Sequence, residues 1–397
     1  MSGAPVRRTP LPGVLEPAGR TIGAEERAAV LRVLDSAVLC STFGGETRAL
    51  EAEMESLYGR SAVACSSGTA ALHLAVAAVR FEPGDEVITT PISDFGTVGP
   101  ILAQNGVPVF ADVDPATGNL DPAAVEAAIT PRTKAIIAVH LFGAAADVVA
   151  LREIADRHGL MLIEDCAQAW LGTTAEGALL GTFGDIACFS LQQYKHITTG
   201  DGGLAITADP ELAARMRLFL DKGWDRAGGR VHLILGLNYR MTELTAAVAR
   251  AQLTKVGAVV ERRQERAAQL VEALAGSTHS LPGLPNVGLP ALPGHAFWLF
   301  PLIVAGDNKR WADGMAAEGI PVSAGYLDRP LYANPVFSGP VYGTSRYPLD
   351  RDYPAGLCPN AERLIEHTLV VLPWNEGYTK TDVLDIARAI RRVHDDG

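Results

Sequence analysis

Three short segments of this chain carry side chains that could bind an anion, hold a proton or act as a nucleophile. Residues 66–72 (SSGTAAL) follow a short apolar run and open a helical pattern. Small residues at such a turn let backbone N–H groups approach an anion, which the helix dipole also favours. The segment therefore indicates a phosphate site, although an ordinary turn capped by serine has the same pattern.

The second segment puts a carboxylate where an apolar run ends. Asp165 follows the run at residues 160–163, within the sequence IEDCAQA. A carboxylate at the carboxyl edge of a sheet can pair with a protonated pyridine nitrogen through charge and a hydrogen bond. The alternative is an aspartate that only caps a helix, which is a common role.

The third segment contains a lysine among apolar and hydroxyl side chains. Lys195 lies within residues 189–203, FSLQQYKHITTGDGG. Partial desolvation lowers the pKa of an amine and makes it a better nucleophile, whereas an isolated loop lysine is usually a solvated surface residue. Together the three segments supply an anion site, a partner for a ring nitrogen and an amine for an aldehyde. Pyridoxal 5'-phosphate (PLP) needs these three parts.

The elements that must position these side chains follow from the alternation of apolar runs and helical patterns between residues 61 and 256. The clearest helical patterns cover residues 68–79, 123–129 and 148–158. Strands that are apolar on both faces and alternate with helices predict an α/β fold with a mostly parallel sheet covered on both sides. In such sheets ligands bind outside the carboxyl ends of the strands.

The composition and the secondary-structure pattern of the sequence change in its last third. A long helical pattern covers residues 242–276, with Gly257 as a possible break, and residues 281–360 are rich in proline, glycine and tyrosine. We therefore predict an N-terminal arm plus large PLP-binding domain, and a linking helix plus smaller α+β domain. Their ranges are 1–256 and 257–397.

Composition excludes several classes of partner. The formal net charge of -11 argues against affinity for nucleic acid or anionic membranes. The five cysteines lack CxxC spacing, which disfavours a disulfide framework or a zinc site, and we expect no metal. The sequence shows no signal peptide and no run of 18 apolar residues, so we expect a cytoplasmic protein.

The motifs SSGTAAL, EDxAQA, FSxxxxK, TTGDGG and NYRMTE occur in this order. With them, residues 44–393 resemble the DegT/DnrJ/StrS family of sugar and aminocyclitol aminotransferases. The resemblance implies an aspartate-aminotransferase-like fold of type I, with a seven-stranded sheet in the large domain. It also implies PLP as cofactor, with pyridoxamine 5'-phosphate as its intermediate form. L-glutamate or L-glutamine would be the amino donor, and a ketone of a sugar or cyclitol the acceptor.

The resemblance also implies residue roles. Lys195 would bond covalently to the cofactor and move the proton between substrate and cofactor, and Asp165 would pair with the pyridinium nitrogen. Further residues would contact the cofactor's phosphate, ring oxygen or ring face: Gly68, Thr69 and Ser190 on the phosphate, Gln168 on the oxygen and Phe95 stacked on the ring. Asn238 would reach the phosphate of the neighbouring subunit, which implies a homodimer with shared active sites.

Two segments depart from the family pattern. Trp170 and Leu171 stand where many members have His-Gly, and Asp94 stands where a threonine often precedes the aromatic residue. Both departures are expected near the acceptor pocket. Residues 326–337 and 224–230 are further candidates for contact with the substrate.

Two other functions compete with the aminotransferase. A keto-sugar dehydratase of the same fold would carry histidine in place of the lysine, and the motif spacing puts Lys195, not His196, at that position. A non-enzymatic PLP-binding regulator would bind the cofactor without turnover. A complete set of catalytic groups disfavours the regulator, because binding alone needs no proton-moving lysine.

Overall fold

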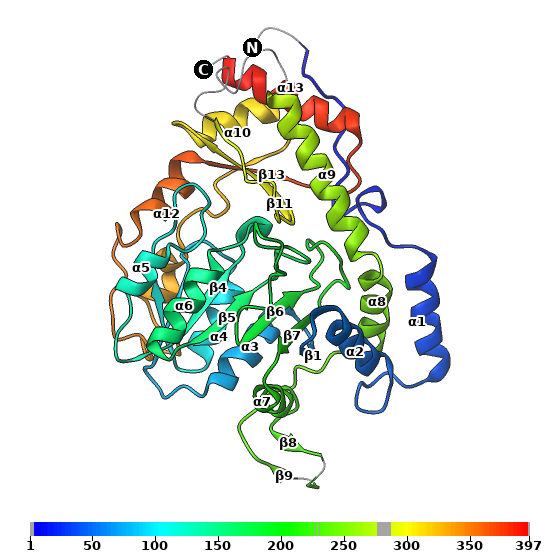
Figure 1. Cartoon of the computed structure of the whole chain (residues 1–397), viewed down its shortest axis with the longest axis vertical. Coiled ribbons are helices and arrows are strands. Elements are labelled where there is room, and N and C mark those ends of the chain that lie inside the picture. The colour runs from blue at the N-terminus through cyan, green and yellow to red at the C-terminus, as the bar shows by residue number, and fades with distance from the viewer. Residues whose placement is uncertain (1–3, 227, 230, 276–286, 396–397) are drawn as a thin grey trace.

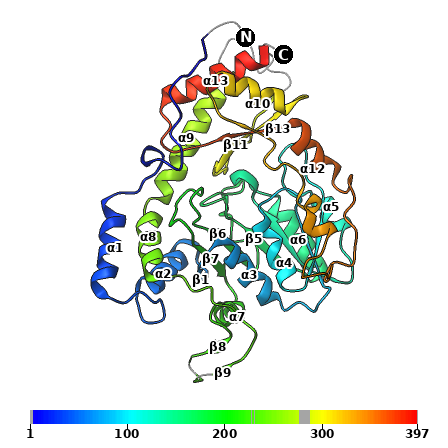
Figure 2. The ribbon, with the colours of Figure 1, turned by 180° about the vertical axis from the view of Figure 1, so that it is seen from behind.

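The computed structural model describes residues 4–226, 228–229, 231–275 and 287–395. A large α/β part lies below a smaller part that carries both ends of the described chain (Figure 1). The same arrangement is visible from behind, where α1 (Ala24–Ser36) lies at the side of the large part (Figure 2). In the described part, no helix is long and apolar enough to cross a membrane.

The large part is built on a seven-stranded sheet of order β1-β7-β6-β5-β4-β2-β3. Only β7 runs antiparallel to its neighbours, so the prediction of a mostly parallel sheet is confirmed. The strands are β1 (Ser61–Cys65), β2 (Glu86–Thr89), β3 (Val107–Phe110), β4 (Thr133–Val139), β5 (Met161–Asp165), β6 (Ile186–Ser190) and β7 (Gly203–Thr207).

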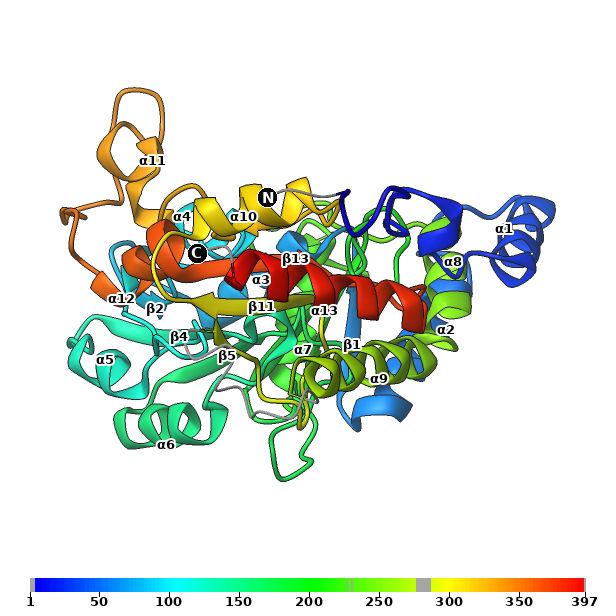
Figure 3. The same cartoon turned by 90° about the horizontal axis from the view of Figure 1, so that it is seen from above.

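Both faces of this sheet are buried. Successive residues of a strand point to opposite faces, so Leu162 and Ile163 of β5 enter different apolar cores. One core includes α2 (Glu46–Tyr58), α5 (Pro122–Ala127), α6 (Val148–His158) and α8 (Glu243–Leu253). The other includes α3 (Gly68–Val79), α4 (Gly99–Ala103) and α7 (Pro210–Leu220). Seen from above, α5 and α6 lie on the opposite side of the sheet from α3 and α4 (Figure 3).

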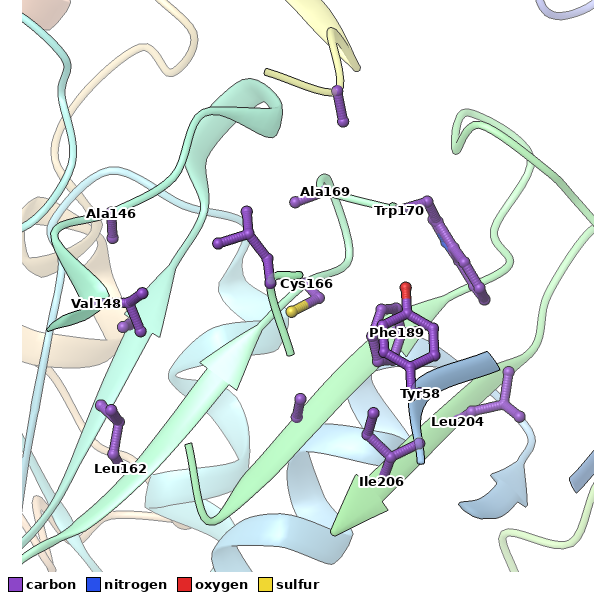
Figure 4. Packing of buried hydrophobic residues seen from close by; sticks show 14 of the residues in the cluster. Tyr58, Ala146, Val148, Leu162, Cys166, Ala169, Trp170, Phe189, Leu204 and Ile206 are labelled. Carbon is purple, nitrogen blue, oxygen red and sulfur yellow. The ribbon is translucent and has the colours of Figure 1, made fainter. Parts of the chain in front are cut away.

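An aromatic group fills the first of these cores beside β6. The ring centroid of Phe189 lies 4.9 Å from those of Tyr58 and Trp170 (Figure 4). Trp170 is fully buried, and its indole N–H donates to the Ser190 carbonyl at 2.9 Å. Trp170 itself does not line the cavity at the carboxyl edge of the sheet, although its partner Ser190 does, so its expected place near the acceptor pocket stays a prediction. The indole fills core volume and supports the end of β6.

The smaller part contains a four-stranded antiparallel sheet of order β10-β11-β13-β12. Helix α9 reaches both parts, because Val260 belongs to a large-part core and Leu270 to the small-part core. The boundary at 256/257 stays a prediction. The elements are α9 (Val256–Ala275), β10 (Val287–Gly288), β11 (Leu299–Val304), α10 (Asn308–Ala317), β12 (Ser323–Ala324), α11 (Pro335–Ser338), α12 (Pro359–Arg363), β13 (Leu369–Pro373) and α13 (Lys380–Asp395).

The break in the long helix does not fall at Gly257, where the sequence suggested it. Helix α8 ends at Leu253 and α9 begins at Val256, so Gly257 lies inside a helix. At the break, the Lys255 ammonium binds the Glu26 carboxylate and the Thr21 carbonyl, both at 2.7 Å. The two helices are thus separated where the chain contacts the segment leading to α1.

Replacing Leu162 by alanine tests the sheet core. Leu162 is fully buried in β5, so Leu162→Ala should lower the free energy of unfolding by about 2–5 kcal/mol through lost burial and a cavity. Leu384 of α13 is 43% exposed, and Leu384→Ala should cost less than about 1 kcal/mol. Urea unfolding at one fixed protein concentration measures both. Equal losses would contradict this assignment of the core.

Candidate active site

A cavity of about 780 Å³ lies where the large and small parts meet. The large part contributes Asp165 and Ser190, which are the last residues of β5 and β6. The small part contributes Trp298 and Tyr326, and residues 12–16 of the N-terminal arm form a further wall. The cavity therefore lies at the carboxyl edge of the sheet, as expected for an α/β fold.

Lys195 enters this cavity from the loop after β6. Its backbone N–H donates to the Gln192 carbonyl at 2.9 Å, and its carbonyl accepts from the Arg20 guanidinium at 2.8 Å. Its Nζ lies 4.0 Å from the centroid of the Trp298 ring. Burial lowers the pKa of Lys195 to about 8, although the charges of Asp165 and Asp94 oppose the shift. With a pKa of about 8, roughly a tenth of this amine is neutral at pH 7, far more than for a solvated lysine, and the neutral form is the nucleophile.

Asp165 lies at the buried end of the cavity. Its Oδ2 accepts from the Thr97 hydroxyl at 3.0 Å, and its Oδ1 accepts from the Ala167 N–H at 3.1 Å. Burial raises the pKa of this carboxyl, and the two hydrogen bonds and the charge of Lys195 act in the opposite direction. A carboxylate with these partners and one open side can stabilise a cationic ring nitrogen.

The start of α3 forms an anion cradle beside these two residues. Ser67 caps the helix by accepting from the Ala70 N–H at 3.0 Å. A Cβ on Gly68 would lie only 2.7 Å from the Ser190 Cβ, so the close approach requires glycine. The Ser190 hydroxyl accepts from the Gln192 N–H at 3.2 Å, which leaves its own O–H able to donate. With Thr69 in the lining, these groups fit a phosphate.

Gln168 is buried behind the cavity wall. Its Oε1 accepts from the Phe142 N–H at 2.7 Å. Burial raises the pKa of Tyr326 above its ordinary value, and the Gln168 side chain is near enough to the Tyr326 hydroxyl to act on that pKa in the opposite direction. Gln168 does not line the cavity itself, whereas Tyr326 does.

Besides Gln168, two predicted contacts, Phe95 and Asn238, are not brought into the cavity by this chain. Phe95 is 43% exposed and its ring packs over Gly99, while its neighbours Asp94 and Thr97 line the cavity instead. Asn238 is exposed and its backbone pairs with that of Asp221. A stacking role for Phe95 and a contact of Asn238 with a neighbouring subunit stay predictions.

Of the two segments predicted to contact the substrate, one contributes a described residue to the cavity lining and the other does not. Tyr326, at the start of residues 326–337, lines the cavity, whereas none of the described residues within 224–230 does. Residues 227 and 230 lie outside the described part. The sequence did not indicate that Trp298 and the arm residues 12–16 line the cavity, because they lie about a hundred residues or more from Lys195 and carry no local motif.

His140, Glu164 and Cys166 lie close together near Asp165, but the polar side-chain atoms of His140 and Glu164 are already engaged. His140 Nδ1 accepts from the Ala146 N–H at 3.1 Å, so the proton on Nε2 donates to Glu164 at 3.0 Å. Glu164 also accepts from three backbone N–H groups that follow Leu180. The group therefore supports the structure beside β5.

Comparison with known proteins identifies the family to which this chain belongs. The model of the DegT/DnrJ/EryC1/StrS aminotransferase family matches residues 20–391. The chain belongs to this family. It is a PLP-dependent aminotransferase, and the cradle, the carboxylate and the amine of the cavity fit that cofactor.

Two curated relatives and one solved structure show the range of similarity. The chain is 36% identical to an L-glutamine:2-deoxy-scyllo-inosose aminotransferase of Streptomyces kanamyceticus, over 99% of this chain and 95% of the relative. It is 38% identical to a UDP-N-acetyl-3-dehydro-alpha-D-glucosamine 3-aminotransferase of Acidithiobacillus ferrooxidans, over 91% and 92%. The structure of NtdA from Bacillus subtilis with bound pyridoxamine phosphate has a TM-score of 0.83 and 26% identity, over 98% and 86%.

The lowered pKa of Lys195 predicts how the amine reacts with pH. In the cofactor-free protein, acetylation of Lys195 by trace acetic anhydride should rise with pH through a midpoint near 8, because only the neutral amine reacts. Asp94→Asn should move the midpoint lower, since the Asp94 charge stabilises the ammonium. Peptide mass spectrometry measures the labelling. A midpoint near the ordinary value of 10.5 would show that Lys195 is fully solvated.

Proposed function

We propose that this aminotransferase moves an amino group from L-glutamate or L-glutamine to a ketone of a sugar or cyclitol. The observation that carries the proposal is the shared cavity of Lys195, Asp165 and the anion cradle at Gly68. The relatives named above act on a cyclitol ketone and on a nucleotide-linked keto-sugar. Both acceptors are ring ketones rich in hydroxyl groups.

The predicted site residues have separate roles in this proposal. PLP, when bound, accepts the amino group at its aldehyde carbon and withdraws electrons from the reacting substrate carbon. Lys195 would hold the cofactor covalently at that carbon, and its Nζ would take and return the proton of the substrate carbon. Asp165 keeps the ring nitrogen protonated, and Gly68, Thr69 and Ser190 hold the phosphate. Gln168 is proposed to orient the ring oxygen together with Tyr326.

The geometry favours the aminotransferase over the dehydratase. His196 is buried, and its Nε2 lies 2.9 Å from the Ala296 carbonyl. Burial, reinforced by the charge of Arg263, keeps the pKa of His196 well below its ordinary value. His196 also does not line the cavity, whereas Lys195 does. The proton-moving base at this position is therefore proposed to be the lysine.

The absorption spectrum of the purified protein with PLP tests this function. A band from the covalently bound cofactor should convert to that of the pyridoxamine form when L-glutamine or L-glutamate is added. Lys195→Ala should lose the band and turnover, whereas His196→Ala, checked for folding by circular dichroism, should keep both. Turnover by Lys195→Ala but not His196→Ala would favour the dehydratase. A band that neither donor changes would favour the regulator.

We also propose that the protein is a homodimer with shared active sites. The hairpin of β8 (Trp224–Asp225) and β9 (Val231–His232) projects from the large part, at the bottom of Figure 1. Apolar side chains are exposed at and just after it, and Leu235 is 88% exposed. Such exposed apolar side chains are typical of a protein–protein interface, and closed two-fold dimers are the commonest assembly. Asn238 lies in the same exposed segment.

A charge at the hairpin should disrupt this dimer. Leu235→Asp should shift the mass measured by light scattering from twice the chain mass to the chain mass, because the carboxylate would be buried unpaired. Val149→Asp, at a site on α6 that is 48% exposed, is the matched control and should remain dimeric. A wild-type monomer, or a dimeric Leu235→Asp variant, would overturn the proposed assembly.

A further inference from the structure

The indole of Trp298 contacts the predicted catalytic lysine in two places. Lys195 Nζ lies over the indole ring, 4.0 Å from its centroid. The indole N–H donates at 2.7 Å to the Tyr194 carbonyl, which belongs to the peptide bond that joins Tyr194 to Lys195. One side chain of the small part thus contacts both the reactive amine and the peptide next to it, within a single chain.

The position of this ring is fixed through the backbone of Trp298. Its N–H donates to the Phe142 carbonyl at 2.8 Å, and its carbonyl accepts from the Arg263 guanidinium at 3.1 Å. Arg263 is fully buried and pairs with Glu376 at 2.7 Å. The indole also meets the Tyr326 ring edge-on, with 6.0 Å between the centroids and an interplanar angle of 87°. The ring is therefore preorganised and needs little rearrangement to serve the amine.

The residue before Trp298 has a strained backbone. Phe297 has a φ of 49°, in the left-handed region that a bulky side chain rarely adopts. Its carbonyl accepts from Arg263 at 3.0 Å, and the Ala296 N–H donates to the Gly143 carbonyl at 2.8 Å. Strain of this kind persists only where the surrounding structure fixes it, and it clusters at functional sites. Here buried hydrogen bonds hold it directly before the ring that contacts Lys195.

An aromatic face differs from the other groups around the amine. Burial lowers the pKa of Lys195, and the carboxylates of Asp165 and Asp94 oppose that shift. Behind the lysine, burial keeps the pKa of His196 well below its ordinary value, and Arg20 binds the Lys195 carbonyl rather than the amine. The other titratable side chains of the described lining are Glu16, Tyr194, Asp201, Tyr326 and Tyr378. The negative face of an indole does not titrate, so it can stabilise an ammonium without exchanging a proton with it.

We propose that Trp298 is a catalytic residue whose indole face stabilises the Lys195 ammonium that forms when the amine takes a proton from the substrate carbon. The inference rests on the proposed function, in which Lys195 moves that proton. The bond from the indole N–H to the Tyr194 carbonyl keeps the lysine loop aligned with the ring. The small part therefore takes part in proton transfer, because it supplies this face to an amine of the large part.

Fluorinated tryptophan tests the ring face with little change in its shape. Fluorine withdraws electron density from the face and leaves the indole N–H in place, so mono-, di- and trifluorotryptophan at position 298 should weaken the contact stepwise. Trace acetylation of the cofactor-free protein should then show the midpoint of Lys195 falling, by about 0.4 to 1.5 pH units in all. The midpoint falls because a weaker face favours the neutral amine over the ammonium. A midpoint that stays in place or rises would overturn the proposal.

The same series at Trp311 is the matched control. Trp311 is a buried tryptophan of α10 that packs in the small-part core and does not line the cavity. Fluorination there should leave the midpoint of Lys195 unchanged. An equal fall in both series would show a general effect of fluorination, and the role assigned to Trp298 would be wrong.

Two simpler variants extend the test to the PLP-loaded protein. Trp298→Phe keeps an aromatic face and loses the indole N–H, whereas Trp298→Leu loses both. With saturating L-glutamine or L-glutamate, stopped-flow absorbance should show conversion to the pyridoxamine form slowed by about two- to thirtyfold in Trp298→Leu. The loss should be smaller in Trp298→Phe, and KM for the donor should change little in both. A change in KM alone would assign Trp298 to substrate binding and overturn the catalytic role.

The labelling and kinetic measurements can fail separately. If Trp298→Leu loses the circular dichroism of the folded protein, the fluorinated series decides, because its side chains keep the volume of tryptophan. If neither donor converts the wild-type protein, the proposed function fails. The labelling midpoints still decide in that case whether Trp298 stabilises the ammonium of Lys195.

Discussion

A lysine amine and an aspartate carboxylate share one cavity that is largely removed from water, and the surrounding elements hold them there. Removal from water disfavours both charged forms: it lowers the pKa of Lys195 to about 8 and raises that of Asp165. Each charge partly stabilises the other, and the Thr97 hydroxyl and the Ala167 N–H give the carboxylate further partners. The result is a reactive amine beside an acid that can serve a ring nitrogen.

The parallel sheet brings these groups together, because the carboxyl ends of its strands meet at one edge. Strands β5 and β6 are neighbours and Asp165 pairs with Cys188, so Asp165 and Ser190 lie at the same edge although they are far apart in the chain. Gly68 packs directly against Ser190, which brings the start of α3 to the same edge. The position of the phosphate cradle thus depends on a contact that only glycine permits.

The N-terminal arm and the small part complete the site around this edge. Arg20 donates to the Lys195 carbonyl, and Asn375 donates to the Gly19 carbonyl at 3.0 Å. The arm is thereby tied to the lysine loop and to the small part at once. Trp298 lies against the Lys195 amine, and Glu16 adds a carboxylate at the opening. These contributions give the cavity its aromatic wall and much of its negative charge.

The sequence by itself determined the alternation of strands and helices, the turn that opens α3, and the placement of Asp165 at the end of a strand and of Lys195 in a loop before the next strand. Each of these depends on residues close together in the chain. Only the tertiary structure decided which side chains face the cavity. The Asp94–Gly96 bond puts Asp94 in the lining and Phe95 outside it, and packing against Phe189 places Trp170 in the core. Spacing along the chain cannot specify these directions, because they follow from long-range packing and from the local turn geometry.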